Sequence, residues 1–209
     1  MIGISLISNG IDSPVASYVM RPHVDSMIFL HADIRPYTDD RMHENVKTLL
    51  THLRSLLKIS LKLYMVPHGP ALQAYNLMCQ NRFNCVFCKR MFIRYANRIA
   101  TNESADFIIM GDSLGQVASQ TLQNIKVIDQ ISTLPILRPL IGFDKTDIVR
   151  YAKEIGTYQY SILNAQSCTA VPNKPATQAS LSALLKEEEK IDCDRLANQA
   201  VKDALIEYF

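Results

Sequence analysis

The chain has 209 residues, of which 48% are hydrophobic and 20% charged, and its net charge at pH 7 is +2. This composition excludes a disordered or fibrous protein, and the charge is too small to indicate a nucleic-acid partner by itself. No run of about 18 apolar residues predicts a membrane span, and the start of the chain lacks the basic segment of a secretion signal. We therefore expect a cytoplasmic protein with one large domain.

Short apolar segments alternate with amphipathic helical segments along the chain. The expected strands are residues 2–7, 27–31, 61–66, 107–110 and 135–137, and the clearest expected helices are 38–57, 87–100 and 144–155. This alternation predicts an α/β fold, with a parallel five-stranded sheet and helices on both faces. Residues 181–209 are expected to form a helical extension packed on the same domain, with the charged run 186–190 as a solvated helix end.

The loop from Ser8 to Ser13 joins the first strand to a helix. It is neither a Walker loop nor a dinucleotide-binding fingerprint, but it has the parts of an anion-binding site. Gly10 allows close approach of the backbone, both serines offer hydroxyls, and the helix N-terminus directs N–H groups at an anion. Asp12 would repel a naked phosphate and thus implies a magnesium ion or an organising role. An ordinary turn capped by Ser and Asp is the alternative.

The pattern Ser-x-Gly-x-Asp-Ser at residues 8–13 resembles the loop of PP-loop ATP pyrophosphatases. Further segments resemble the catalytic domain of the tRNA 4-thiouridine synthetase (ThiI) family, and they cover nearly the whole chain. They are Cys-Val-Phe-Cys-Lys-Arg-Met at 85–91, Gly-Asp-Ser-Leu-Gly-Gln-Val-Ala-Ser-Gln-Thr at 111–121, Leu-Arg-Pro-Leu-Ile-Gly-Phe-Asp-Lys at 137–145, and Ile-Gly-Thr at 155–157 followed by Cys168. The resemblance implies the PP-loop, or adenine nucleotide alpha hydrolase-like, fold for residues 1–180. Asn9 stands where the family usually has Gly, and Asn is the least costly replacement if that position needs a positive φ.

The resemblance also implies an activity, that of an ATP-dependent tRNA sulfurtransferase. Family members adenylate O4 of a tRNA uracil, release pyrophosphate and then replace the adenylate with sulfur, which implies ATP and Mg²⁺ as cofactors. The nucleotide-binding residues it implies are Ser8, Gly10, Asp12, Ser13, Gly111, Gly115 and Gln120, and the catalytic residues are Asp12, Lys145 and Cys168. Lys145 lies in the first helical turn, where a cation is unfavourable, and this suggests an anionic partner such as a phosphate.

Five cysteines, two of them in a C-x-x-C pair, favour a metal or redox site over a set of structural disulfides. Family members without a rhodanese domain are understood to hold an iron–sulfur cluster, which implies Cys85, Cys88 and Cys168 as its ligands, with one iron open to sulfide. A disulfide between Cys168 and one of the pair, a zinc site completed by Cys79, and no joint role are the alternatives. Cys193 is expected to be an inert thiol.

Arg90, Arg94 and Arg98 recur every fourth residue beside Lys89 and predict a basic helix face for tRNA phosphates, with a solvated face as the alternative. The family's N-terminal ferredoxin-like and THUMP domains have no counterpart here. The expected partners are therefore tRNA, a separate THUMP-type RNA-binding protein or a second subunit, and a sulfur donor. Two other functions stay open: sulfur transfer to a carrier protein for the thiamine thiazole, and a non-catalytic nucleotide- or cluster-binding module.

Overall fold

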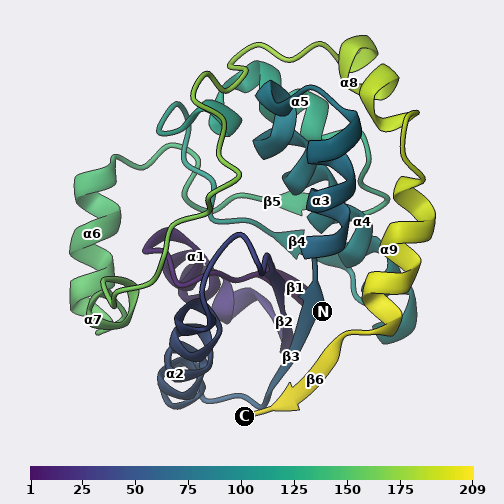
Figure 1. Cartoon of the computed structure of the whole chain (residues 1–209). Coiled ribbons are helices and arrows are strands. Elements are labelled where there is room, and N and C mark those ends of the chain that lie inside the picture. Colours follow the sequence, from purple (N-terminus) through teal and green to yellow (C-terminus); the bar gives the residue numbers. More distant parts are fainter.

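The computed structural model describes all residues from 1 to 209 and contains one six-stranded sheet between two layers of helices (Figure 1). The strands are β1 (Ile2–Leu6), β2 (Ser26–Asp33), β3 (Leu61–Pro67), β4 (Phe107–Ile109), β5 (Ile136–Leu137) and β6 (Leu205–Tyr208). Their spatial order is β5-β4-β1-β2-β3-β6. The first five strands are parallel, as expected, and the sixth pairs antiparallel with β3.

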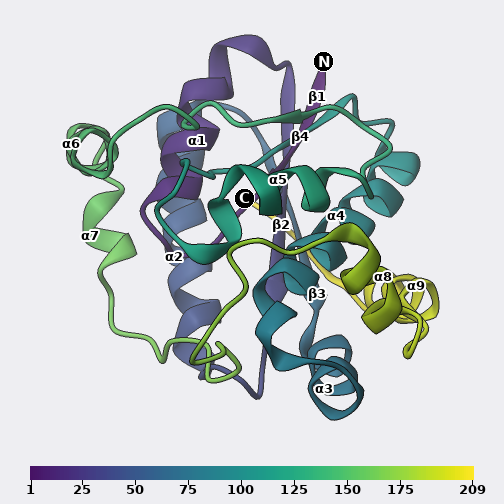
Figure 2. The ribbon, with the colours of Figure 1, turned by 90° about the horizontal axis from the view of Figure 1, so that it is seen from above.

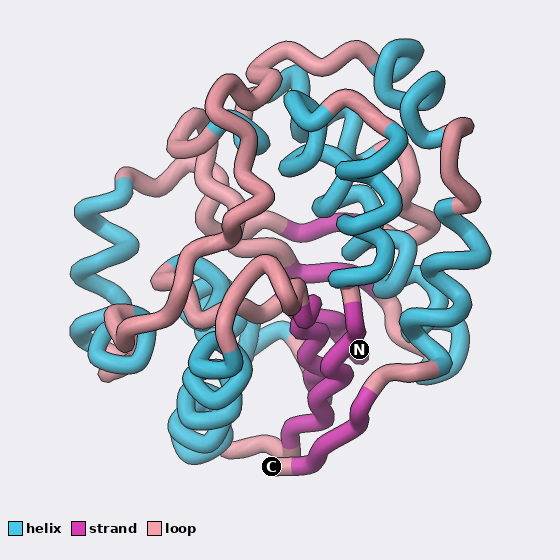
Figure 3. Tube along the Cα trace, in the orientation of Figure 1, coloured by secondary structure: helices cyan, strands magenta, loops and turns pink.

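Helices cover both faces of the sheet, which lies between them in the view of Figure 2 and is seen as magenta strands in Figure 3. One layer contains α1 (Asp12–Met20), α2 (Asp40–Leu57), α6 (Lys145–Glu154) and α7 (Tyr158–Ser161). The other contains α3 (Gly69–Met78), α4 (Asn84–Glu103), α5 (Leu122–Asp129), α8 (Leu181–Glu188) and α9 (Cys193–Lys202). Short 3₁₀ turns lie at Arg21–His23, Asn81–Phe83 and Ala118–Gln120. No helix is both long and apolar enough to cross a membrane.

The two layers correspond to two hydrophobic cores, one on each face of the sheet. Successive side chains of a strand point to opposite faces, so β2 contributes Ile28 and Leu30 to one core and Met27 and Phe29 to the other. The first core contains 27 buried residues and the second contains 20. Burial on both faces explains why the strands are continuously apolar in sequence.

The predicted basic face of α4 is wrong, because Arg90 and Arg94 are buried. Their side chains are only 1% and 9% exposed, and both guanidinium groups donate to Glu188, at 2.7 and 2.8 Å. Arg90 also donates to the Val127 carbonyl at 2.7 Å. Arg98 pairs with Asp194 of α9 at 2.8 Å. The three arginines lie on one face of α4, as their spacing of four residues predicts. That face packs against α8 and α9 and is not free for RNA.

The C-terminal segment differs from its prediction in two further ways. Glu187 and Glu188 of the charged run are buried, and Glu187 accepts from the Gln80 amide and from Lys190. The chain also ends in a strand, β6, where only helices were expected. Strand β6 is held by antiparallel pairing with β3 and by the Glu207–Lys47 ion pair at 2.7 Å. Both contacts are with segments that are distant in sequence, so local periodicity does not reveal them.

Removing the Glu188 carboxylate should destabilise the fold strongly. Burial raises the pKa of Glu188, but hydrogen bonds from Arg90 and Arg94 outweigh this effect and leave the pKa below its usual 4.5. We expect Glu188→Gln to lower the free energy of unfolding by about 3–5 kcal/mol at pH 7, because two buried cations lose their partner. The exposed neighbour Glu189, changed to Gln, should alter it by less than about 0.5 kcal/mol. Denaturant unfolding measures both.

The same comparison has a defined pH dependence. The folded-state pKa of Glu188 is lowered, so its stabilisation is fully present above pH 4.5 and is lost as the pH falls through the folded value. The difference between wild type and Glu188→Gln should therefore narrow below about pH 4.5. A difference that is small at pH 7, or that grows on acidification, would contradict the assignment.

Candidate active site at the carboxyl ends of the strands

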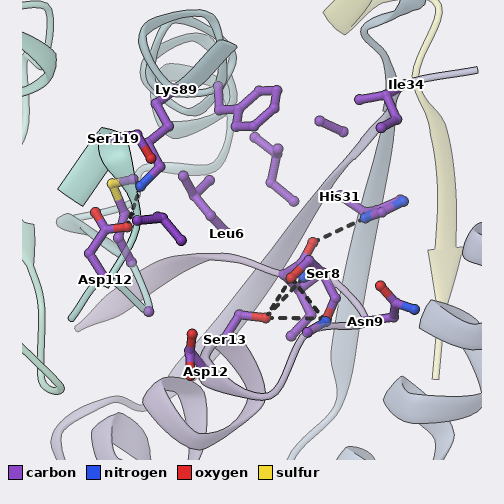
Figure 4. A pocket seen from close by; sticks show the side chains of 18 of the residues that line it. Leu6, Ser8, Asn9, Asp12, Ser13, His31, Ile34, Lys89, Asp112 and Ser119 are labelled. Atoms are coloured by element: carbon purple, nitrogen blue, oxygen red, sulfur yellow. Dashed lines mark hydrogen bonds and ion pairs between the residues drawn. The ribbon is translucent and has the colours of Figure 1, made fainter. Parts of the chain in front are cut away.

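A cavity of about 370 Å³ opens at the carboxyl ends of β1, β2 and β4 (Figure 4). The chain passes from β1 to β2 on one side, whereas β4 pairs with β1 on the other, so the strand order reverses at β1. A crevice forms at such a reversal because the loops that follow the two neighbouring strands diverge. The cavity therefore lies where ligands of open α/β sheets bind.

Ser8 and Ser13 hold the loop after β1 in shape. The Ser13 hydroxyl accepts from the Ser8 amide at 3.0 Å, and the Ser8 hydroxyl accepts from the Gly10 amide at 3.2 Å. No side chain caps the first turn of α1, which begins at Asp12. The N–H groups of that turn therefore have no side-chain acceptor and are available to an anion. Ser8, Gly10, Asp12 and Ser13 all line the cavity.

Gly111 brings the end of β4 against the start of α1. A Cβ atom on this residue would lie 2.8 Å from the Ser13 amide nitrogen and 2.9 Å from the Asp12 carbonyl carbon, closer than packing allows. Gly115 has a different role, because its φ of +75° shapes a turn whose amide donates to the Gln120 carbonyl, and it does not line the cavity. Gln120 lines the cavity and has a buried side-chain oxygen without a hydrogen-bond partner.

Asn9 adopts an ordinary backbone conformation. Lys58 and Ser104 are the only non-glycine residues with positive φ, so position 9 does not need the left-handed conformation that glycine would allow. Asn9 lines the cavity beside Ser8 (Figure 4). The departure from glycine in this loop therefore introduces no backbone strain.

Lys145 of α6 lies over the same loop and pairs with Asp12. Its Nζ atom is 2.5 Å from Asp12 Oδ1, so the anionic partner that its position suggested is here a carboxylate. Asp144 caps the helix by accepting from the Thr146 amide. The Lys145 side chain is 45% exposed. Lys145 itself does not line the cavity.

Asp112 carries the charge network on the opposite wall, and the sequence analysis did not select it as a site residue. Its carboxylate is 2.5 Å from Lys89 Nζ and 3.0 Å from Arg138 Nε, and Arg138 also pairs with Asp129. Burial raises the pKa of Asp112, but the two cations outweigh it and hold the pKa below its usual value. The only sequence signal for this network was the position of Asp112 beside Gly111.

A second cavity, of about 220 Å³, contains the predicted cysteines. Cys85 and Cys88 lie in the first turns of α4, Cys168 lies on the loop after α7, and all three line this cavity among mainly apolar residues. The loop is fixed by hydrogen bonds from the Thr38 hydroxyl to Gln166 O at 2.6 Å and from the Thr169 amide to Tyr37 O at 2.9 Å. The structure thus brings Cys168 together with the Cys85–Cys88 pair, which is distant from it in sequence.

All five cysteines are free thiols, and no group of three side chains has metal-binding geometry. Burial and the neighbouring cysteines raise the pKa of Cys85 and raise that of Cys88 further. Cys79 does not reach this cavity and donates to the Glu187 carbonyl, so it cannot complete a zinc site there. Cys193 is buried, and burial raises its pKa to about 11, which fits an inert thiol.

The structure adds His68, which the sequence analysis did not select as a site residue. The residue is fully buried, and burial lowers its pKa to about 3, so the imidazole is neutral. His31, two residues before the end of β2, is a further buried histidine and lines the larger cavity, with Nδ1 3.0 Å from the Ile7 carbonyl. A polar residue near the end of an apolar strand was the signal that could have identified both.

The fold and the anion-binding loop after β1 define an α/β domain of the PP-loop type. The chain matches the family model described as Thiamine biosynthesis protein (ThiI) over residues 2–193, and it belongs to this family. The crystal structure of a 4-thiouridine synthetase in complex with RNA and bound ATP superposes with a TM-score of 0.94 at 33% identity. That match covers 100% of this chain and 55% of the other.

Curated relatives show the same extent of similarity. Proteins named probable tRNA sulfurtransferase from Finegoldia magna and Methanosarcina mazei are 39% and 37% identical, over 95% and 96% of this chain. The chain spans about half the length of these relatives, 51% and 50%. An NMN synthetase from Francisella tularensis superposes with a TM-score of 0.56 at 16% identity, and this similarity shows the fold alone. The match covers 98% of this chain and 87% of the NMN synthetase.

Gly111→Ala tests the contact between β4 and α1. The added Cβ must displace the backbone of the Ser8–Ser13 loop, so we expect a loss of about 1–3 kcal/mol in the free energy of unfolding and weaker ATP binding. Gly142→Ala is the matched control, because a Cβ there meets nothing within 4 Å, and it should change stability by less than about 1 kcal/mol. Thermal unfolding measures the stability of both variants, and calorimetric titration measures their ATP binding. Equal stability and equal ATP affinity of the two variants would contradict the role of Gly111.

Proposed function

We propose that this domain catalyses ATP-dependent sulfur transfer to tRNA, forming 4-thiouridine. ATP adenylates O4 of a uridine and releases pyrophosphate, and sulfur then replaces the adenylated oxygen and releases AMP. Activation must come first, because a carbonyl oxygen is a poor leaving group and an adenylate is a good one. Support comes from family membership, from the relatives named tRNA sulfurtransferase and from the similarity to an ATP-bound 4-thiouridine synthetase.

The observation that carries the proposal is a wall shared by the two cavities. Ile34, Lys89, Phe92 and Ser119 line both the cavity with the anion-binding loop and the cavity with the three thiols. A uridine placed at this wall would face the nucleotide on one side and a sulfur on the other. Such proximity is what a reaction with two successive steps on one atom requires.

The loop residues have defined roles in the first step. Ser8, Gly10 and Ser13 would donate to the pyrophosphate as its charge develops, together with the uncapped turn of α1. Asp12 would hold Mg²⁺ with the phosphates, since this ion favours one or two carboxylates plus substrate oxygens. Lys145, now paired with Asp12, would then stabilise the phosphate charge. Gly111 and Gln120 would contact ATP or the uridine, and Gly115 would support them through its turn.

The sulfur step would use the thiol cavity. Three thiols around an apolar cavity without carboxylates are a donor set that fits an iron–sulfur cluster on Cys85, Cys88 and Cys168. Cys168 would serve the sulfur transfer as one of these three ligands. Such a cluster would supply an open iron that binds sulfide. The chain's own contribution is to gather the three sulfurs beside the wall and to keep water away from the activated uridine.

Recognition of tRNA requires a protein surface in addition to the one that this domain provides. The net charge is +2, and the arginine face of α4 is buried, so this domain presents no basic stripe there. We propose that tRNA binding depends on a THUMP-type RNA-binding protein or a second subunit. Phosphate contacts position RNA without choosing a base, so the choice of uridine would come from the shape of the folded tRNA.

A second acceptor remains a candidate, because the family model carries the description of a thiamine biosynthesis protein. In that function the same adenylation would activate a carrier protein for thiazole formation. Parallel reactions with folded tRNA and with such a carrier, each supplied with ATP and sulfide, distinguish the two. A non-catalytic module is disfavoured by the presence of Asp12 and Ser13 in the loop, by the Asp12–Lys145 pair and by the gathered thiols, which include Cys168.

Asp12→Asn tests the first step. Without the carboxylate we expect pyrophosphate release in the presence of Mg²⁺-ATP and folded tRNA to fall at least about 100-fold, because the metal loses its protein ligand. Asp147→Asn is the control, since Asp147 lies in the first turn of α6 but pairs with Arg150, away from the cavity. Release at the wild-type rate by Asp12→Asn, or no tRNA-dependent release by the wild type, would contradict the proposal.

A further inference from the structure

His68 contacts the sulfur of Cys88 from the side that does not face the thiol cavity. Its Nε2 atom is 3.2 Å from Cys88 Sγ, and its Nδ1 atom is 2.8 Å from the Tyr95 hydroxyl. His68 is fully buried and does not line the cavity, whereas Cys88 does. The sulfur of Cys88 is therefore open to the cavity on one side and hydrogen-bonded to an imidazole on another.

The imidazole is held firmly in this orientation. The His68 amide donates to the Asp33 carbonyl at 2.7 Å, and its carbonyl accepts from Leu72 in the first turn of α3. The ring packs edge-on against Phe92, with 4.9 Å between the centroids. The backbone and both ring nitrogens of His68 have hydrogen-bond partners, and a rotation of the ring away from Cys88 would break these ring contacts.

Two arrangements of protons satisfy these contacts. When Cys88 is a thiol, its S–H can donate to Nε2, and Nδ1–H then donates to the Tyr95 oxygen. When the sulfur is deprotonated it can only accept, so Tyr95 must donate to Nδ1 and the ring must carry its proton on Nε2. The chain Tyr95–His68–Cys88 is thus able to follow the protonation state of the sulfur without moving any heavy atom.

We propose that His68 is a positioning residue that donates an Nε2–H hydrogen bond to an anionic sulfur at Cys88, in the proton arrangement that Tyr95 selects. Its role in catalysis rests on the proposed function, whereas the hydrogen bond itself does not. The shared chemistry is a negatively charged sulfur, either a thiolate bound to iron or a persulfide.

The cavity needs such a donor because little else favours a charged sulfur at Cys88: the other contribution comes from a backbone N–H at Cys88 itself. Lys89 follows Cys88 directly, but its Nζ atom is paired with Asp112 at 2.5 Å. No lysine or arginine donates a hydrogen bond to Cys85, Cys88 or Cys168. An anionic sulfur among apolar side chains is costly unless it accepts hydrogen bonds, and bonds to a charged acceptor are the strong ones.

The metal-free chain provides the first test. Alkylation by iodoacetamide at one fixed pH, followed by mass spectrometry, gives separate rates for the three cysteines of the cavity. We expect His68→Leu to slow Cys88 by about 10-fold or more, because the thiolate loses its donor. Cys85 and Cys168 in the same molecule are internal controls and should change by less than about twofold. His68→Gln, which keeps an N–H near the Nε2 position, should restore much of the rate.

If the His68 variants do not fold, Tyr95→Phe tests the same hydrogen bond through the alkylation rate of Cys88. This change removes the hydroxyl that selects the proton arrangement and should slow Cys88 by about 2- to 10-fold. Tyr75→Phe is the matched control, because Tyr75 is also buried beside Phe87 but its hydroxyl has no hydrogen-bond partner. It should leave all three rates unchanged.

The protein reconstituted with iron and sulfide distinguishes the two sources of negative sulfur. If Cys88 binds iron, loss of the donor should lower the reduction potential in His68→Leu relative to wild type and to Tyr75→Phe. If no cluster forms, the metal-free variants are treated with a polysulfide, whose sulfane sulfur the Cys88 thiolate takes up while the shortened polysulfide anion leaves. The persulfide content of Cys88 should then be lower in His68→Leu than in wild type and in Tyr75→Phe. An unchanged Cys88 alkylation rate in both folded His68→Leu and Tyr95→Phe, or spectroscopic evidence of His68 nitrogen bound to iron, would overturn the proposal. Absence of tRNA thiolation would affect only the proposed function.

Discussion

The contact between Gly111 and the backbone of Ser13 fixes the arrangement of the functional residues. It joins the end of β4 to the loop after β1 at the point where the strand order reverses. The next residue, Asp112, is thereby placed where it binds Lys89 of α4, and Lys89 follows Cys88 in sequence. A continuous set of contacts therefore connects the anion-binding loop to the thiol cavity.

The two cavities differ in ways that suit two successive chemical steps. The larger one has hydroxyls, backbone N–H groups and Asp12 at its edge, which are suited to phosphate and Mg²⁺. The smaller one is mostly apolar and gathers three thiols whose charge it does little to stabilise. The imidazole of His68 is the polar contact that compensates for this at Cys88.

Much of this arrangement follows from sequence, because it depends on local patterns. The apolar strands, the loop from Ser8 to Ser13 and the cysteine spacing are all local signals, and they predicted the parallel sheet and the elements that place the site. The buried pairs of Arg90 and Arg94 with Glu188 were missed, since helical spacing identifies a face but not what packs against it. Strand β6 was missed for the same reason, because its partner β3 is distant in sequence. The roles of individual site residues are still predictions.

The central claim is that activation and sulfur delivery occur in separate cavities joined at one wall. Cys168→Ser tests it most directly, with Cys79→Ser as control because Cys79 lies outside the thiol cavity. Folded tRNA is incubated with each variant, Mg²⁺-ATP and sulfide, and pyrophosphate release and 4-thiouridine are measured in the same reaction. The account predicts that Cys168→Ser releases pyrophosphate at close to the wild-type rate but forms no 4-thiouridine, whereas the control does both. Wild-type thiolation by Cys168→Ser, or loss of both steps in a folded variant, would contradict it.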